Sequence, residues 1–142
     1  MGYAFTLKKG CWYGLDKQKI KILIADDNKD VNLLIAATLI LKGYEVYKTY
    51  SAEECLSKLN EMNRTVDVML LDGAIAADRG VMVIVKAKRI NPDIKILAVA
   101  DDESEKTRVL DYGADGFTTK PISVETIVTK ISALLAVGKS VG

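Results

Sequence analysis

Three aspartates and one lysine in the sequence are of the right types to act together on a phosphorylated substrate. Asp26 and Asp27 follow one apolar run, Asp72 follows another, and Lys120 follows a third. Clustered carboxylates repel one another and resist ionisation unless a cation neutralises them. Magnesium is a hard cation that is typically held by one or two carboxylates together with a phosphoryl oxygen. The residue types therefore predict a divalent cation, Mg²⁺, beside a carboxylate that faces phosphate.

Beside such a cation, Asp72 has the chemistry of a nucleophile. Its carboxylate would attack phosphorus and form an acyl phosphate, while Lys120 would stabilise charge on the equatorial oxygens. Each feature alone also has an ordinary explanation. An acid pair after a strand often caps a helix, and a Lys-Pro pair is common in loops. Their joint occurrence at the ends of strands favours the chemical interpretation.

The elements that must position these residues are strands and helices in alternation. Continuous apolar runs predict strands, and a pattern of helical period follows each of them. The five strands are expected over about 20–25, 44–49, 66–71, 94–99 and 116–119. Right-handed crossovers then give an α/β fold, a doubly wound five-stranded parallel sheet with five helices in a three-layer sandwich. Ligands bind beyond the carboxyl ends of such strands, where the acids and the lysine lie.

The first two helices carry the clearest end signals. Gly43 is typical of a glycine that ends the first helix, and Ser51 is expected to cap the second, with Glu54 completing a capping box. The first helix is expected to bury a stripe at helical spacing formed by Val31, Leu34, Ile35, Thr38 and Leu39.

Composition narrows the function classes further. The chain has 142 residues, 49% of them hydrophobic, with 20 basic and 19 acidic residues, so no strong net charge points to nucleic acid or an anionic membrane. Two cysteines, Cys11 and Cys55, and no histidine leave zinc without its usual ligands. Since no apolar run approaches the roughly 20 residues of a membrane span, we expect a cytoplasmic protein without membrane insertion.

Strong patterning begins at Ile20 and divides the chain. Residues 1–19 are expected to be an N-terminal extension of unknown role, residues 20–138 the folded domain, and residues 139–142 a tail. The extension shows neither a strand nor a helix period. Its aromatic residues Phe5, Trp12 and Tyr13 leave packing on the domain, disorder and contact with a partner as open alternatives.

The sequence resembles the CheY-like receiver domains of two-component response regulators. The resemblance rests on the acid pair in KILIADDN, the aspartate in VDVMLLD and the run YGADGFTTKP, and it covers about Lys19 to Val137. It implies a flavodoxin-like fold and phosphorylation of Asp72 by a sensor histidine kinase or phosphotransfer protein. These domains carry no catalytic activity beyond their own phosphorylation and dephosphorylation, so we do not expect an enzyme.

The resemblance also implies the roles of individual site residues. Asp27 would bind Mg²⁺ directly and Asp26 through water, while Asp72 and the backbone carbonyl of Ala74 would complete the protein ligands. Lys120 would contact the phosphoryl group, and its bond to the following proline would be cis.

The chain departs from the family pattern at two places near the site. Ala100, or in a shifted alignment Ala98, stands where the family has the Thr or Ser of its switch. Ile75 and Ala76 replace a common Met-Pro pair. Phe117 occupies the position of the aromatic switch residue, where packing explains it equally well. Without a substitute such as water or a nearby serine, loss of the hydroxyl removes a hydrogen bond worth about 1.5–3 kcal/mol.

Two functions remain open from the sequence. The first is a stand-alone phosphoacceptor that signals by protein contact through the fourth helix, fifth strand and last helix, without binding nucleic acid directly. The alternative is a pseudo-receiver, a binding module whose switching is impaired because alanine replaces the Thr or Ser. Either is compatible with a homodimer. A phosphatase of similar architecture is disfavoured because Ala74 stands where it needs a second acid.

Overall fold

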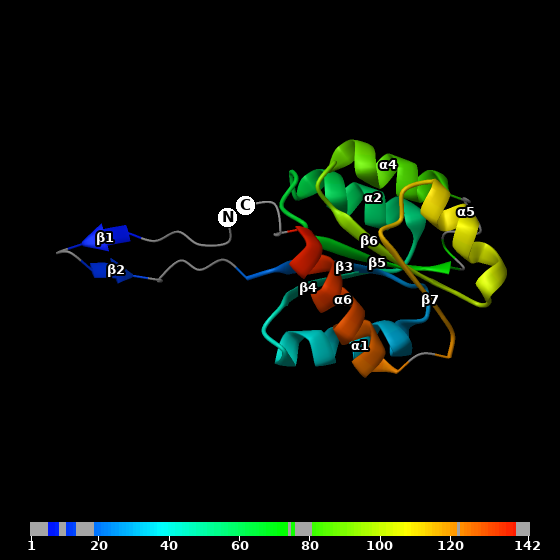
Figure 1. Cartoon of the computed structure of the whole chain (residues 1–142), viewed down its shortest axis with the longest axis horizontal. Coiled ribbons are helices and arrows are strands. Elements are labelled where there is room, and N and C mark those ends of the chain that lie inside the picture. The colour runs from blue at the N-terminus through cyan, green and yellow to red at the C-terminus, as the bar shows by residue number, and fades with distance from the viewer. Residues whose placement is uncertain are drawn as a thin grey trace.

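A computed structural model describes residues 6–8, 11–13, 19–73, 75, 81–121 and 123–138. Its centre is a sheet of five parallel strands (Figure 1). In chain order the strands are β3 (Lys21–Ala25), β4 (Glu45–Thr49), β5 (Val68–Asp72), β6 (Lys95–Ala100) and β7 (Gly116–Thr119). Their spatial order is β4-β3-β5-β6-β7, which is the flavodoxin-like order of a doubly wound sheet.

Helices cover both faces of this sheet. Within the described residues they are α1 (Lys29–Leu41), α2 (Ala52–Glu61), α4 (Met82–Ile90), α5 (Lys106–Asp111), which a 3₁₀ turn over Glu103–Glu105 precedes, and α6 (Val124–Gly138). Helices α1 and α6 lie on one face, and α2, α4 and α5 lie on the other (Figure 1). Each face has its own apolar core. The expected three-layer α/β sandwich is confirmed.

The central strands are buried on both faces, as their sequences predict. All residues of β5 are buried, and four of the five in β3 are buried. Such strands read as continuous apolar runs because helices cover both sides of a parallel sheet. Since the strands run in the same direction, their carboxyl ends meet at one edge, where Asp72 lies opposite Val99 of β6. That edge carries the candidate site.

The predicted helix ends are largely confirmed. Helix α1 ends before Gly43, whose φ of +98° favours glycine. The Ser51 hydroxyl accepts a hydrogen bond from the backbone N–H of Glu54 at 3.1 Å and caps α2. The Glu54 carboxylate accepts from the backbone N–H of Tyr50 at 2.6 Å, one residue before the cap. The capping box is therefore present with its return bond shifted by one residue.

The predicted buried stripe of α1 is partly wrong. Ile35 and Leu39 are buried as expected, but Val31 and Leu34 are 41% and 59% exposed, and Thr38 is half-buried. The side chains that α1 buries are Asn32, Ile35, Ala36 and Leu39. From Leu33 to Leu41 every residue except Thr38 is apolar, so the sequence pattern does not mark which face turns inward.

The N-terminal region contains two short strands that the sequence did not predict. Strands β1 (Thr6–Lys8) and β2 (Cys11–Tyr13) pair antiparallel as a separate two-stranded sheet. Strands of three residues are too short to display a period in the sequence.

Among the helices that the structure describes, none is both long and apolar enough to cross a membrane.

Candidate functional site

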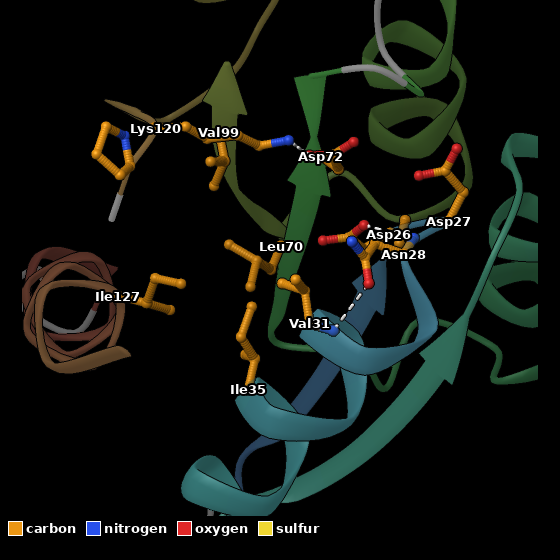
Figure 2. Close-up of a pocket in the computed structure, with 12 residues that line it drawn as sticks. Asp26, Asp27, Asn28, Val31, Ile35, Leu70, Asp72, Val99, Lys120 and Ile127 are labelled. Carbon is orange, nitrogen blue, oxygen red and sulfur yellow. Dashed lines mark hydrogen bonds and ion pairs between the residues drawn. The ribbon is translucent and has the colours of Figure 1, made fainter. Parts of the chain in front are cut away.

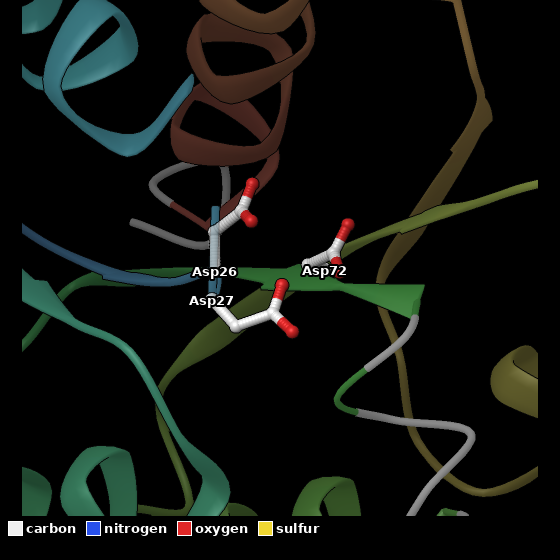
Figure 3. A group of neighbouring side chains, drawn as sticks. All are labelled: Asp26, Asp27 and Asp72. Carbon is white, nitrogen blue, oxygen red and sulfur yellow. The ribbon is translucent and has the colours of Figure 1, made fainter. Parts of the chain in front are cut away.

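Three carboxylates from two adjacent strands meet at the carboxyl edge of the sheet (Figure 3). Asp26 and Asp27 follow β3, and Asp72 is the last residue of β5. One carboxylate oxygen from each lies within 4.8 Å of the others. Asp26 and Asp72 are buried, whereas Asp27 is exposed. The structure thus brings together the three acids that the sequence singled out.

Local hydrogen bonds fix the turn that carries two of these acids. The backbone N–H of Asn28 donates to the Asp26 carboxylate at 2.9 Å. The side-chain oxygen of Asn28 accepts from the backbone N–H groups of Asp30 and Val31, each at 3.1 Å, and so caps α1. The acid pair and the helix cap are therefore parts of one short turn.

Asn32 supports the same turn from inside α1, and sequence reasoning missed it. Its side chain is fully buried, and its amide nitrogen donates to the backbone carbonyls of Asp26 and Thr49, each at 3.0 Å. These two bonds join the end of β3 to the end of β4. An asparagine within an apolar helix was the available signal, because buried polar side chains are normally hydrogen-bonded.

We expect Asn32→Ala to lower the free energy of unfolding by about 1–3 kcal/mol, because it removes two buried hydrogen bonds. Urea unfolding of wild-type and variant chains measures the loss. Asn60→Ala, at an exposed position of α2, is the control and should change stability little. Equal midpoints for Asn32→Ala and wild type would show that Asn32 does not hold the turn.

Lys120 reaches the acid cluster from the end of β7. Its Nζ lies 2.6 Å from Asp72 Oδ1 and 3.9 Å from Asp101 Oδ1. Its backbone N–H donates to the carbonyl of Ala100 at 2.8 Å, and the Lys120–Pro121 bond is cis, as the resemblance implies. Partial burial lowers the pKa of Lys120, but the hydrogen bond and charge of Asp72 outweigh it, and the net shift is upward. Lys120 is therefore cationic at neutral pH.

The cluster suits a hard divalent cation. Burial raises the pKa of Asp26 most, the hydrogen bond from Asn28 opposes this, and the charge of Asp72 raises it further. A cation placed among these carboxylates would relieve both the desolvation and the repulsion. All three donors are carboxylate oxygens, which are the ligands that Mg²⁺ prefers. The residues present therefore fit the cation that the sequence predicts.

The raised pKa of Asp26 has a consequence for stability. The folded chain binds this proton more tightly than the unfolded chain, so ionising Asp26 costs stability. The cost is absent below the unfolded value near 3.8 and complete above the folded value. Without metal, Asp26→Asn should therefore stabilise the chain at pH 7 and not at pH 3.5.

Urea unfolding in buffer with chelator at both pH values measures this difference. Asp111→Asn, at an exposed position at the end of α5, is the matched control. A stabilisation by Asp26→Asn that is the same at both pH values would contradict the assignment of the effect to ionisation.

The switch positions lie together in the core beside the site. Ala98, Ala100 and Phe117 are buried in the core under α2, α4 and α5. Ala98 lies opposite Phe117 in the sheet, and Ala100 is the alanine that contacts the Lys120 backbone. The hydroxyl of Ser104 donates a hydrogen bond to the Asp102 carboxylate. In this arrangement it does not replace the Thr or Ser hydroxyl that is missing from β6.

Gly73 is a second residue that sequence reasoning missed. A Cβ at this position would lie 2.5 Å from the carbonyl oxygen of Val99 and 2.7 Å from Cα of Ala100. Only glycine permits this close approach of the chain after β5 to the end of β6. Ile75 is buried. Ala74, the expected carbonyl ligand, and Ala76 lie outside the described residues.

A cavity of about 500 Å³ opens beside the acids (Figure 2). Asp26, Asp72 and Lys120 line it at one end. Apolar side chains from α1, α6 and the sheet line the rest, namely Val31, Ile35, Leu70, Val99 and Ile127. The Asp72 carboxylate therefore borders an accessible space with a largely apolar wall.

Comparisons with known proteins agree with this geometry. A curated relative, the phosphate regulon transcriptional regulatory protein PhoB of Pseudomonas aeruginosa, is 30% identical over 118 residues. The match covers 80% of this chain and 51% of the relative, so the chain spans about half the length of that protein.

Solved structures share the fold. The CheY-like receiver domain protein of Methanospirillum hungatei has a TM-score of 0.79 and 26% identity, covering 88% of this chain and all of that one. A Burkholderia pseudomallei response regulator, solved with a phosphorylated aspartic acid, calcium ion and citrate, has a TM-score of 0.70 and 23% identity. The match covers 87% of this chain and 76% of that one. The profile of the response regulator receiver domain family matches residues 22–132. The chain therefore belongs to the response regulator receiver domain family of two-component signal transduction.

Proposed function

We propose that this receiver domain accepts a phosphoryl group on Asp72 from a histidine kinase or phosphotransfer protein. The observation that carries the proposal is the position of the Asp72 carboxylate. It is 3% exposed, pairs with Lys120 Nζ at 2.6 Å, and lies with two further acids at the carboxyl edge of the sheet. A buried carboxylate between a lysine and an acid pair has the charge environment that phosphoryl transfer requires.

Each residue has a distinct part in the proposed reaction. An Asp72 carboxylate oxygen forms a bond to phosphorus, and the bond from phosphorus to the donor breaks with its electron pair leaving on the donor. The ammonium group of Lys120, which pairs with Asp72 in the structure, would move to a phosphoryl oxygen. The carboxylates of Asp26, Asp27 and Asp72, with the carbonyl of Ala74, would hold Mg²⁺, which when bound neutralises charge on the phosphoryl oxygens.

Intact-mass spectrometry with a small acyl-phosphate donor tests this proposal without the kinase. We expect a single phosphoryl adduct on the wild-type chain in Mg²⁺ and none in excess chelator. A wild-type chain that gains no mass in Mg²⁺, while metal titration still shows binding, would contradict phosphoacceptance and favour the pseudo-receiver.

We further propose that the chain acts as a signalling partner rather than as an enzyme. We also propose that it acts in the cytoplasm, where a kinase would reach it. The expected output face comprises α5, β7 and α6, the fourth helix, fifth strand and last helix of the fold. Near-neutral net charge supports contact with a protein rather than with nucleic acid.

The second candidate function is a pseudo-receiver with impaired switching. The observation in its favour is that Ala98, Ala100 and Phe117 belong to one buried apolar cluster, and that the residues of β6 include no hydroxyl that could bind a phosphoryl group. A two-state surface with a gap of a few kcal/mol depends on such single hydrogen bonds. Asp72 would then carry phosphate without moving the α5–β7–α6 face.

Restoring the hydroxyl tests the coupling. We expect Ala100→Thr to enlarge the phosphorylation-dependent NMR shift changes at Phe117, because a hydroxyl beside Lys120 gives the phosphoryl group a hydrogen bond from β6. Ala100→Val is the control, since it matches the shape of threonine without the hydroxyl. Equal shift changes in the two variants would show that the hydroxyl is not the missing link.

A further inference from the structure

The cavity beside the acids has an apolar wall that extends well beyond the carboxylates (Figure 2). Four side chains in this wall are at most 6% exposed, namely Ile35, Leu70, Val99 and Ile127. Water against such a wall finds few hydrogen-bond partners, and a hydrated Mg²⁺ ion binds oxygen ligands and not hydrocarbon. A volume of about 500 Å³, mostly apolar with a few polar groups at one end, is typical of small-molecule sites. The proposed phosphorylation makes no use of this wall.

The cavity opens at the carboxyl edge of the sheet. Val31 of α1 is 41% exposed, Asp27 and Pro121 are exposed as well, and all three line the cavity. The carboxylates and Lys120 lie at this edge, whereas the buried apolar side chains lie deeper, between α1, α6 and the sheet (Figure 2). A ligand with an apolar body and one polar end therefore fits the cavity with its polar end at the mouth.

The polar end of the cavity favours a cation. The three carboxylates of the acid cluster face one ammonium group, that of Lys120. Asp26 is 8% exposed, and its carboxylate is directed into the cavity (Figure 2). Within the described residues only one of its two carboxylate oxygens, Oδ1, accepts a hydrogen bond, from the backbone N–H of Asn28. A buried carboxylate oxygen without a donor is costly, so Asp26 Oδ2 is a position where a charged N–H donor would be stabilised.

We propose that this cavity binds a small amphiphilic amine, with its ammonium group among the three carboxylates and its apolar body against the four buried side chains. An anion of the same shape would face three like charges, and a neutral ligand would leave the excess negative charge unbalanced. Because the ammonium group and Mg²⁺ would occupy the same carboxylates, the two compete. Such a ligand would therefore slow phosphorylation of Asp72. That consequence rests on the proposed function, whereas the binding itself does not.

An NMR titration of the methyl groups of the full chain with hexylamine, in buffer with chelator and without a phosphoryl donor, tests the site. We expect saturable shift changes at Ile35, Leu70, Val99 and Ile127. Hexanol and hexanoate bring a similar tail without a positive charge and should bind at least about tenfold more weakly. Ethylamine brings the charge with a shorter tail and should bind on the order of 100-fold more weakly, at roughly fourfold per methylene. Equal affinities of hexylamine and either hexanol or ethylamine would overturn the proposal, as would a titration without shift changes at these methyl groups.

Two pairs of variants locate the ligand in the cavity. Asp26→Asn should weaken hexylamine binding about tenfold and leave hexanol binding unchanged, and Asp111→Asn, at the exposed end of α5, is its control. Val31→Lys should also weaken hexylamine binding, because it adds a positive charge at the mouth of the cavity. Leu34→Lys makes the same charge change at an exposed position of α1 that does not line the cavity. Added Mg²⁺ should raise the apparent dissociation constant of hexylamine. Affinity that Asp26→Asn, Val31→Lys and Mg²⁺ all leave unchanged would overturn the proposal.

Discussion

Replacing Asp72 with asparagine is expected to reduce phosphoryl adduct formation from one per chain to none. The amide has nearly the shape of the carboxylate but lacks the anionic oxygen that attacks phosphorus. We do not expect Asp26 or Asp27 to substitute, because Asp72 is the member of the acid cluster whose carboxylate pairs with Lys120 Nζ, at 2.6 Å. Intact-mass spectrometry of both chains with acyl phosphate and Mg²⁺ measures the difference.

The matched control for this experiment is Asp101→Asn. Asp101 also lies near Lys120, at 3.9 Å, but its side chain is largely exposed. Removing it changes the local charge by the same amount and leaves the nucleophile in place, so its adduct should persist. An adduct that survives in Asp72→Asn, with its site mapped to another acid, would refute the assignment of Asp72.

The largest effect on stability is expected from Gly73→Ala, at about 3 kcal/mol of unfolding free energy. The new methyl group would overlap the carbonyl oxygen of Val99 and Cα of Ala100, which are backbone atoms of a central strand and cannot move aside cheaply. Because Gly73 directly follows Asp72, any adjustment also displaces the Asp72 carboxylate. We therefore expect slower phosphorylation in the fraction of the variant that folds.

Gly43→Ala separates this overlap from the general cost of losing a glycine. Gly43 has a φ of +98°, and a Cβ there would meet nothing within 4 Å. Its replacement should cost only about 1–2 kcal/mol, the price of a left-handed conformation. Urea unfolding of both variants gives the comparison. A smaller loss for Gly73→Ala than for Gly43→Ala would mean that the chain after β5 relaxes away from β6.

The fold was predictable because its signals are local and repeated. Each buried strand is an apolar run, and turn residues such as Gly43 and Ser51 separate the elements. The meeting of Asp26, Asp27 and Asp72 followed from topology, since parallel strands end at the same edge. Even so, Asp72 proved to be the last residue of β5 rather than the first residue beyond it.

The missed features depend on contacts between distant segments. The inward face of α1 was predicted wrongly, since Val31 and Leu34 were expected to be buried and are exposed. In a helix with apolar residues on both sides, the hydrophobic pattern does not show which side faces the sheet. Asn32 matters through the carbonyl of Thr49, seventeen residues away. Gly73 matters through Ala100 in another strand. A single sequence shows the residue types at these positions but not the backbone that approaches them.

The sheet order also bears on how the protein matures during synthesis. Strand β5 lies at the centre of the sheet and near the middle of the chain. Its neighbour β6, and Lys120 after β7, are synthesised later. A nascent chain that ends before β6 has Asp72 on an unpaired strand edge, without its lysine. Because domains fold as units once their strands are complete, we expect a ribosome-bound chain to become competent for phosphorylation only after β7 has emerged.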